Sequence, residues 1–414
     1  MRTPLDSPFS PGADTVPQVW AGRTAQLSDW RDALRPRRLA GIHDRGRTVL
    51  GEAGLGKSSL VRRIAGDASR RGDWVTPQLR IPSGADPLKR VASALMDLAQ
   101  QAGLPSAREK GIRDLLGRVE TVAAVGVSLT LREQDGPEPY TTLTELLVEI
   151  GRAAIRRGDV VALVHIDEVQ NIASEEALSQ LLIALGDALA HEEPVTAPGG
   201  VVIQRALPIA VYLTGLPEFA DMAGARKGAT FARRFQTTTL APIDDTDLAA
   251  ALQPFLIDGW EIPSEDGVST RIHMEPEALN AIVELCCGEP FLFQLAGQQA
   301  WYAGTGSVIT KAEVLTGWQS ARSEAASHVE RILGRLPPRE RQFVEVMAGL
   351  EPADRTLTRI ATGMGFAKAS DAGPASQRLD SIRGIVQRSP KPYTFRHRAV
   401  EAYLTSEWPV ADLS

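Results

Sequence analysis

The sequence of 414 residues has few cysteines, few aromatic residues and no long apolar runs. Its two cysteines, Cys286 and Cys287, are neighbours and cannot join distant parts of the chain, which argues against both a disulfide framework and a zinc cluster. No apolar run approaches the roughly 20 residues that a membrane-spanning helix needs. The first 18 residues lack the basic start and the apolar core of a signal peptide. We therefore expect a soluble, cytoplasmic protein with no membrane partner.

The overall composition is that of a globular protein. Hydrophobic residues make up 43% of the chain and charged residues 23%, and the formal net charge is −6. A chain of this length can bury two or three cores, and its composition excludes a disordered or collagen-like protein. The segment 1–18 is rich in Pro, Ser and Asp and predicts a mobile tail. We expect folded domains over 19–262, 263–332 and 333–414.

Short apolar strands alternate with longer amphipathic segments in the first folded domain. Strands are expected at 47–50, 74–80, 160–166 and 209–213, and helices from 57 to about 65, at 87–101 and at 141–157. This alternation predicts an α/β fold, with a parallel sheet covered by helices on both faces. The segment 106–133 interrupts the plan with an alternating stretch typical of an inserted strand or hairpin.

Helical patterns dominate the rest of the chain. Helices are expected at 275–287, 291–303 and 310–332, without strands, which predicts a small helical domain. The last eighty or so residues predict helices at 338–347, 357–364 and 374–383 and a short ribbon with the sequence IVQRSPKPYTFR. Three helices followed by a two-stranded ribbon indicate a winged helix.

The strongest motif lies between the first expected strand and the following helix. The pattern G-x-x-x-x-G-K-[ST] is matched by Gly51, Glu52, Ala53, Gly54, Leu55, Gly56, Lys57 and Ser58, with Ser59 next. In such a loop the glycines let backbone N–H groups turn toward a phosphate at the positive end of a helix. Lys57 is expected to reach the β- and γ-phosphates of ATP, and the Ser58 hydroxyl to ligate Mg²⁺. A turn that merely caps a helix would explain the glycines but not Lys57 and Ser58.

A carboxylate pair follows the most apolar strand, in the sequence VVALVHIDEVQN. Ligands of open α/β sheets bind outside the carboxyl ends of the strands. We expect Asp167 to hold the Mg²⁺ and Glu168 to orient and deprotonate the attacking water. If the pair stood alone in the sequence, the alternative interpretation would be two solvated acidic residues at the start of a loop. Here the pair follows a buried strand in a chain that also contains the phosphate loop.

The order of these motifs resembles the AAA+ ATPases, in the branch that contains origin-recognition initiators, archaeal-type ATPases and STAND signalling ATPases. Besides the two motifs above, VWAGRTAQLSDW is similar to the family's first motif, and VYLTGLPEF, ATFARRFQTTTLAPI and CCGEPFLFQLAG are similar to later ones. The resemblance extends from Val19 to the C-terminus. It implies a P-loop AAA+ core, a helical lid, a C-terminal winged helix, bound ATP or ADP with Mg²⁺, and assembly into a homo-oligomer.

The resemblance also implies roles for individual residues. Trp20 and Arg23, with Gly22 between them, would lie near the adenine, and Thr214 would be the first sensor. Arg233 or Arg234, with Arg234 favoured, would be the arginine finger. Gly288 and Pro290 would form the G-x-P of the lid.

Each weaker motif has an ordinary alternative. Thr214 could be a strand-end threonine, Arg233 and Arg234 a solvated pair, and Gly288 and Pro290 punctuation between helices. The helix after the G-x-P, unlike that of many AAA+ lids, contains no arginine or lysine that could contact the γ-phosphate. This departure favours a nucleotide switch over rapid cyclic hydrolysis.

Basic residues gather near the C-terminus. The segment from Lys368 to Arg398 carries seven basic and two acidic residues, although the whole chain has a net charge of −6. Such asymmetry is typical of nucleic-acid binding. The helix 374–383 would be the recognition helix, and the expected contacts with double-stranded DNA come from Arg378, Arg383, Arg388 and Lys391. Winged helices also serve as packing or protein-contact modules, which is the alternative.

His397 lies where STAND ATPases keep a histidine that reaches the β-phosphate of ADP, although a histidine between two arginines could equally lie on the surface. The leading hypothesis is a Mg²⁺-dependent ATPase that binds DNA through its winged helix and assembles in a nucleotide-dependent way. One alternative is a STAND-type switch whose winged helix senses ADP and a protein effector. The other is a scaffold that binds ATP without hydrolysing it. The sequence does not indicate the DNA site, the oligomer size or the pathway.

Overall fold

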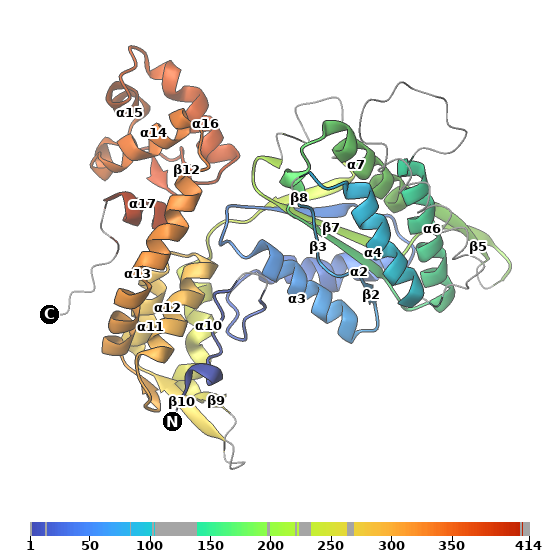
Figure 1. Cartoon of the computed structure of the whole chain (residues 1–414), viewed down its shortest axis with the longest axis horizontal. Coiled ribbons are helices and arrows are strands. Elements are labelled where there is room, and N and C mark those ends of the chain that lie inside the picture. Colours follow the sequence, from blue (N-terminus) through green and yellow to red (C-terminus); the bar gives the residue numbers. More distant parts are fainter. Residues whose placement is uncertain are drawn as a thin grey trace. The chain divides into compact units, whose positions relative to one another are not determined.

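The computed structural model describes residues 2–12, 15–82, 84–101, 103, 139–196, 199–219, 222, 233–262, 269–405 and 408. The chain divides into two compact units, which are coloured along the sequence in Figure 1. The sheet unit consists of Thr24–Leu50 and Leu60–Thr238, and the helical unit consists of Met1–Arg23, Gly51–Ser59 and Thr239–Ser414. The predicted insert at 106–133 falls outside the described residues.

The sheet unit has the predicted α/β fold. Its helices are α1 (Thr24–Ser28), the π-helix η2 (Asp29–Leu34), α2 (Arg35–Leu39), α3 (Lys57–Arg70), α4 (Pro87–Gln101), α6 (Pro139–Arg157), η3 (Val169–Asn171) and α7 (Glu175–Ala190). Its strands are β1 (Gly46–Leu50), β2 (Trp74–Val75), β3 (Leu79–Arg80), β4 (Ala162–Asp167), β5 (Glu192–Thr196), β6 (Val202–Ala206), β7 (Ile209–Gly215) and β8 (Phe235–Thr239). The strand predicted at 74–80 is therefore two short strands.

The six-stranded sheet has the order β2-β4-β7-β1-β8, and β3 also pairs with β4. The pairs among β1, β2, β3, β4 and β7 are parallel. Val164 and Val211 point into an apolar core formed with α4, α6 and α7. Successive side chains of a strand point to opposite faces, so Tyr212 points to the other face, where its ring contacts Trp30 of η2. Because both faces are covered, every residue of β4 and β7 is buried.

The helical unit contains more strands than the sequence predicts. Its elements are η1 (Pro4–Asp6), α10 (Asp245–Ile257), β9 (Trp260–Ile262), β10 (Thr270–Met274), α11 (Pro276–Leu285), α12 (Pro290–Tyr302), β11 (Val308–Ile309), α13 (Lys311–Leu333), α14 (Pro338–Ala348), η4 (Pro352–Asp354), α15 (Leu357–Gly363), η5 (Ala369–Ala372), α16 (Gly373–Ser381), β12 (Val386–Gln387), β13 (Thr394–Phe395) and α17 (Arg398–Thr405). The prediction of a helical domain without strands over 263–332 is wrong, because β10 lies between β9 and β11 in a three-stranded sheet. The strands β9 and β11, of three and two residues, are too short to show an alternating pattern in the sequence.

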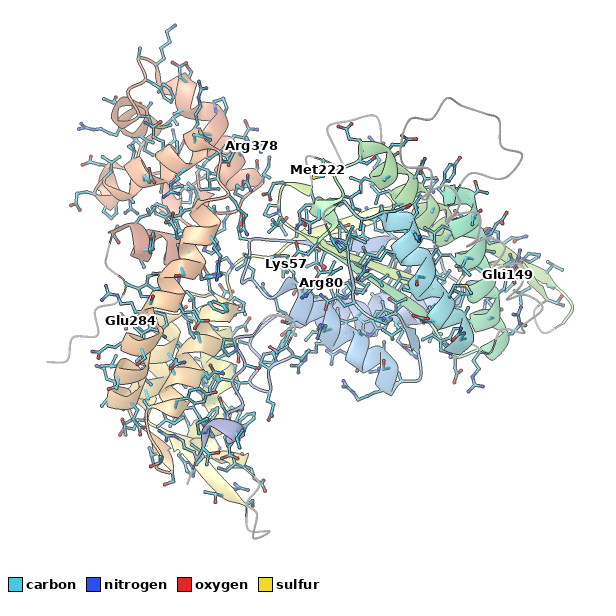
Figure 2. The ribbon with its side chains drawn as sticks, in the orientation of Figure 1. Lys57, Arg80, Glu149, Met222, Glu284 and Arg378 are labelled. Carbon is cyan, nitrogen blue, oxygen red and sulfur yellow. The ribbon has the colours of Figure 1, made fainter. Side chains whose placement is uncertain are left out.

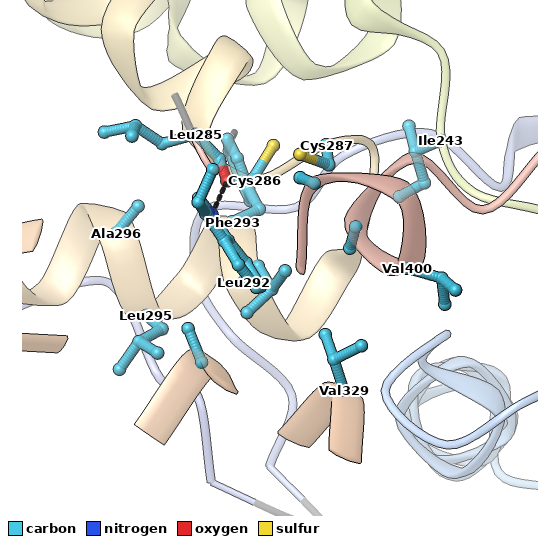
Figure 3. Close-up of a cluster of buried hydrophobic side chains, with 14 of the residues drawn as sticks. Ile243, Leu285, Cys286, Cys287, Leu292, Phe293, Leu295, Ala296, Val329 and Val400 are labelled. Atoms are coloured by element: carbon cyan, nitrogen blue, oxygen red, sulfur yellow. Dashed lines mark hydrogen bonds between the residues drawn. The ribbon is translucent and has the colours of Figure 1, made fainter. Parts of the chain in front are cut away.

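The core of the helical unit lies where α11, α12, α13 and α17 meet. Figure 3 shows Cys286 and Cys287 in this core with Leu292, Phe293 and Val400. Both thiols are free and buried, and burial raises the pKa of each of them. The two cysteines therefore pack as small apolar side chains.

The prediction of a mobile tail over 1–18 is wrong for the described part of that segment. Arg2 is 1% exposed, and its guanidinium donates to the carbonyl oxygens of Trp301, Gly306 and Val308. Phe9 is also buried, with its ring stacked on that of Phe255. The composition of the segment suggested a tail because the few side chains that anchor it are spread among Pro and Ser residues.

The C-terminal module, residues 338–405, contains the predicted order of elements. The helices α14, α15 and α16 are followed by β12 and β13, which pair in antiparallel orientation, and by α17. Figure 2 labels Arg378 on α16, the helix expected to be the recognition helix.

None of the helices in the described residues is both long and apolar enough to cross a membrane.

Candidate nucleotide site

The phosphate loop follows β1 and ends in the first turn of α3, as its motif predicts. Gly54 has a φ of +85°, a conformation that favours glycine, and a Cβ there would lie 2.4 Å from Cε1 of His328. The ammonium group of Lys57, labelled in Figure 2, donates to the Glu52 carbonyl oxygen at 2.9 Å. Lys57 and Ser58 begin α3, where helix N–H groups attract anions. The loop, Lys57 and Ser58 therefore fit a nucleotide phosphate with its Mg²⁺.

The residues expected near adenine belong to the helical unit, as the loop does. Arg23 donates to the Leu55 carbonyl oxygen at 3.0 Å, so it contacts the phosphate loop directly. Burial lowers the pKa of Arg23 to about 10, which leaves the guanidinium charged at neutral pH, and Asp247 partly offsets this effect. The Trp20 indole donates to the Gly22 carbonyl oxygen at 3.0 Å, which closes a local turn.

The G-x-P motif also reaches the phosphate loop. The Phe291 N–H donates to the Gly54 carbonyl oxygen at 3.2 Å. A Cβ on Gly56 would lie 3.7 Å from Cβ of Pro290. The structure thus places the start of α12 against the loop, within one compact unit.

The middle residue of that motif, Glu289, lies in a buried charged cluster with two histidines. One carboxylate oxygen of Glu289 lies 2.7 Å from Nε2 of His328, and the other lies 2.8 Å from Nδ1 of His397. Burial alone raises the pKa of Glu289, but the charge of His397 and the hydrogen bond with His328 outweigh it and lower that pKa to about 2. Burial lowers the pKa of His397, but the negative charge of Glu289 outweighs it and raises that pKa above its usual value. Glu289 and His397 therefore form a buried ion pair.

This ion pair gives a pH-dependent contribution to stability. The contribution of Glu289 is present above its unfolded pKa and is lost as the pH falls toward 2. The contribution of His397 is fully present below pH 6.5 and is lost as the pH rises through the raised pKa. We expect the free energy of unfolding to fall less between pH 5.5 and 8.5 in His397→Gln than in the wild type, as measured by urea denaturation.

The exposed His43 provides the control, because His43→Gln should keep the wild-type pH dependence. An unchanged pH dependence in His397→Gln would contradict the role assigned to this ion pair.

A second charged cluster includes Glu52 of the phosphate loop, which is 1% exposed. Arg335, just after α13, donates to Glu52 at 2.6 Å. Arg383 lies 3.8 Å from the same carboxylate and 3.2 Å from Glu340. Because Glu52 is buried, the loss of either arginine would leave its charge poorly compensated.

In the sheet unit, the ends of β4 and β7 bring together Asp167 and Thr214. Thr214 donates to one carboxylate oxygen of Asp167, and Gln78 donates to the other. His165 lies 3.2 Å from the Thr214 hydroxyl, and burial lowers its pKa to about 4 despite the charge of Asp167. The only hydroxyl proton of Thr214 goes to Asp167, so the neutral His165 donates from Nε2.

Of these two strands, β7 pairs directly with β1, the strand that leads into the phosphate loop, and β4 lies on the other side of β7. In the parallel register Val49 pairs with Thr214, and Leu50 pairs with Gly215. Thr214 therefore lies beside Val49, two residues before the phosphate loop begins at Gly51, and its role as a first sensor stays a prediction. Glu168 follows β4 directly and accepts a hydrogen bond from Gln170.

The two expected arginine fingers occupy the turn before β8. Arg233 is exposed, and Arg234 forms an ion pair with Asp187 of α7 in the same unit. The side chain of Arg234 keeps 36% of its surface exposed.

Four of the seven basic residues near the C-terminus form ion pairs within the chain. Arg378 and Arg383 both bind Glu340, Arg396 binds Asp380, and Arg398 binds Asp245. The side chain of Arg383 is only 3% exposed, so the expectation that it contacts DNA is wrong in this structure. Lys391 is exposed and Arg388 is half-buried. The excess positive charge near the C-terminus is therefore smaller than the sequence count suggests.

Several residues of these sites carry no motif signal. Gln78, His328 and Arg335 contact motif residues from positions that no spacing rule predicts. Glu289 is different, because it lies inside the G-x-P motif, and an acidic residue at that position is a signal that the sequence does contain.

Comparisons with known proteins bear on the fold. No family model matches the sequence, and no curated protein matches it. Solved structures do match: the ORC2 protein of Aeropyrum pernix in its ADPNP-ADP complexes has 16% identity and a TM-score of 0.56, with 97% of this chain and 96% of that chain covered. A Walker-type ATPase of Pyrococcus abyssi has 14% identity and a TM-score of 0.53, with 93% and 96% covered. The chain therefore has the fold of the initiator-type AAA+ P-loop ATPases.

Proposed function

We propose that this protein is a Mg²⁺-dependent ATP-binding and ATP-hydrolysing switch. The observation that carries the proposal is the joining of Asp167 to Thr214 at the ends of β4 and β7, next to the strand that leads into the phosphate loop. The similarity to an ORC2 protein that was solved with ADPNP and ADP supports nucleotide binding.

Each step of the proposed hydrolysis is assigned to particular residues of the chain. Loop N–H groups and Lys57 bind the phosphates, and Ser58 and Asp167 would hold Mg²⁺, which neutralises phosphate charge when bound. Water attacks the γ-phosphorus, the bond to the ADP oxygen breaks, and Glu168 takes the proton of the water. Thr214 fixes the Asp167 carboxylate, and Arg234 would leave its ion pair with Asp187 to act on the nucleotide of a neighbouring copy.

The proposed assembly and DNA binding can be tested in one experiment. Mass photometry of the protein without nucleotide, with ADP and with ATP, each with and without duplex DNA, reports the mass of every complex. We expect larger assemblies with ATP than with ADP, and an added DNA mass. The same mass distribution in all conditions would contradict the switch.

The DNA contacts are proposed for the loop of the ribbon, which joins β12 to β13. Replacing Arg388 and Lys391 with alanine should weaken DNA binding at every sequence, because phosphate contacts carry no sequence information. The slope of log K against log salt should fall by about 0.9 for each lost contact, or roughly 2 in total. Fluorescence anisotropy of labelled duplexes over a salt series measures both quantities.

A control double variant, Lys311→Ala with Arg322→Ala, removes two exposed charges of α13 in the same unit and should keep the wild-type slope. Equal slopes for both double variants would exclude the ribbon as the DNA site. No salt-dependent binding by the wild type in any nucleotide state would exclude DNA binding altogether.

The burial of His397 favours a second candidate function, a STAND-type switch that senses ADP and a protein effector. His397 shares a compact unit with the phosphate loop, and among the described residues its Nε2 has no hydrogen-bond partner. A buried donor without a partner is costly, so a phosphate oxygen could satisfy it. In this case His397→Gln should weaken ADP binding more than ATP binding in isothermal titration, whereas the DNA-binding switch predicts equal effects.

A further inference from the structure

The backbone of Glu168 is held in an unusual conformation. Its φ of +59° and ψ of +40° lie in the left-handed region, which costs a residue other than glycine about 1 kcal/mol or more. The Glu168 N–H donates to the carboxylate of Asp167 at 3.0 Å. Such a conformation persists only when its surroundings hold it in place.

The side chain of Glu168 is held as well. Gln170 donates from Nε2 to the Glu168 carboxylate. The other end of the Gln170 amide, Oε1, accepts a hydrogen bond of 3.0 Å from the Leu216 N–H, just after β7. One amide therefore joins Glu168, which follows β4, to the end of β7.

The Leu216 N–H also determines which end of the amide faces Glu168. A backbone N–H is a donor only, so the oxygen of Gln170 must face Leu216. The nitrogen of Gln170 then faces the carboxylate, where a donor is required. The two hydrogen bonds are consistent with one orientation of Gln170 and inconsistent with the flipped one.

Gly215 provides the space for this bridge. A Cβ at residue 215 would lie 2.8 Å from Oε1 of Gln170 and 2.9 Å from Cγ2 of Val169. Any side chain there would have to displace the amide or the neighbouring valine. The glycine at the end of β7 thus serves the hydrogen bonds of Gln170 rather than a turn.

We propose that Gln170 is the positioning residue that holds the Glu168 carboxylate for proton abstraction and ties it to the end of β7. The inference rests on the proposed function, in which Glu168 is the general base. Gln170 binds one carboxylate oxygen, and the second oxygen accepts the proton of the water. A base that is fixed in this way needs no reorientation before each transfer.

The test compares variants that remove different parts of the bridge. Gln170→Met has a similar length and removes both hydrogen bonds. Gln170→Glu keeps an acceptor for Leu216 but places a second negative charge against Glu168. Gly215→Ala leaves Gln170 in the chain but displaces it. We expect each to lower kcat for ATP hydrolysis by about 10- to 100-fold, with ATP affinity within about twofold of the wild type.

The control for the substitution itself is Gln180→Met on α7, where the Gln180 amide donates to Glu176, one turn earlier on the same helix and outside the site. Its kcat should equal that of the wild type. Thermal unfolding of all variants shows whether the fold is retained. A Gln170→Met protein that folds and binds ATP normally, and hydrolyses it at the wild-type rate, would overturn the proposal.

A double-variant cycle separates positioning from a general structural role. In single-turnover assays, Gln170→Met should have no further effect in a Glu168→Gln background, because the base that it positions is gone. An equal fold-loss in both backgrounds would overturn the proposal. If Glu168→Gln alone hydrolyses ATP as the wild type does, the proposed role of Glu168 is wrong, and this result is distinct from a failure of Gln170 alone.

Discussion

Lys57→Ala should abolish ATP binding. The ammonium group lies in the motif that cradles the phosphates, and it donates to the carbonyl oxygen of Glu52 within the same loop. Charge-assisted bonds to phosphate are stronger than neutral ones, so we expect the Kd for ATP to rise at least about 100-fold, or roughly 3 kcal/mol. Isothermal titration of both proteins with Mg-ATP measures this change.

Lys89→Ala is the matched control, since Lys89 is an exposed lysine on α4. It should bind ATP as the wild type does. Equal ATP affinities for the wild type and Lys57→Ala would refute the phosphate-loop assignment, and with it the proposed function.

Glu168→Gln should retain ATP binding but stop turnover. Glutamine has nearly the same shape as glutamate, so the contacts of the backbone with Asp167 can persist. It cannot take a proton from water, and the loss of a general base lowers kcat by about 10²- to 10⁴-fold. Phosphate release at saturating ATP, together with isothermal titration, separates the two effects.

Glu176→Gln removes an exposed carboxylate from the first turn of α7 and should leave kcat unchanged. A Glu168→Gln protein that still releases phosphate at the wild-type rate would mean that another group activates the water. A protein with neither binding nor turnover would instead indicate that the substitution disrupts the loop after β4.

The features that the sequence predicted well are local in the chain. The phosphate loop is a run of eight residues between a strand and a helix, and the Asp167–Glu168 pair follows an unbroken apolar strand. Chain order alone places both at strand ends of a parallel sheet. The predicted helices over 275–287, 291–303 and 310–332 correspond closely to α11, α12 and α13 because their apolar periodicity is strong.

The errors concern residues whose partners are far away in the sequence. Arg2 is buried by backbone groups around residues 301–308, so composition near the N-terminus could not reveal that the segment is anchored. Arg383 looks like a DNA contact in a basic segment, but Glu340 and Glu52 neutralise it. A count of charges along the chain does not include such partners.

By itself, the sequence determined the α/β fold, the AAA+ resemblance and the residues proposed to bind phosphate, because each depends on spacing within a short segment. The tertiary structure alone decided which side chains hold these residues. Glu289 meets His397, Glu52 meets Arg335, and Asp167 meets Gln78, and the two residues of each pair are at least 89 positions apart in the chain. Burial makes an uncompensated charge costly, so the folded chain must supply a partner from wherever packing brings one close.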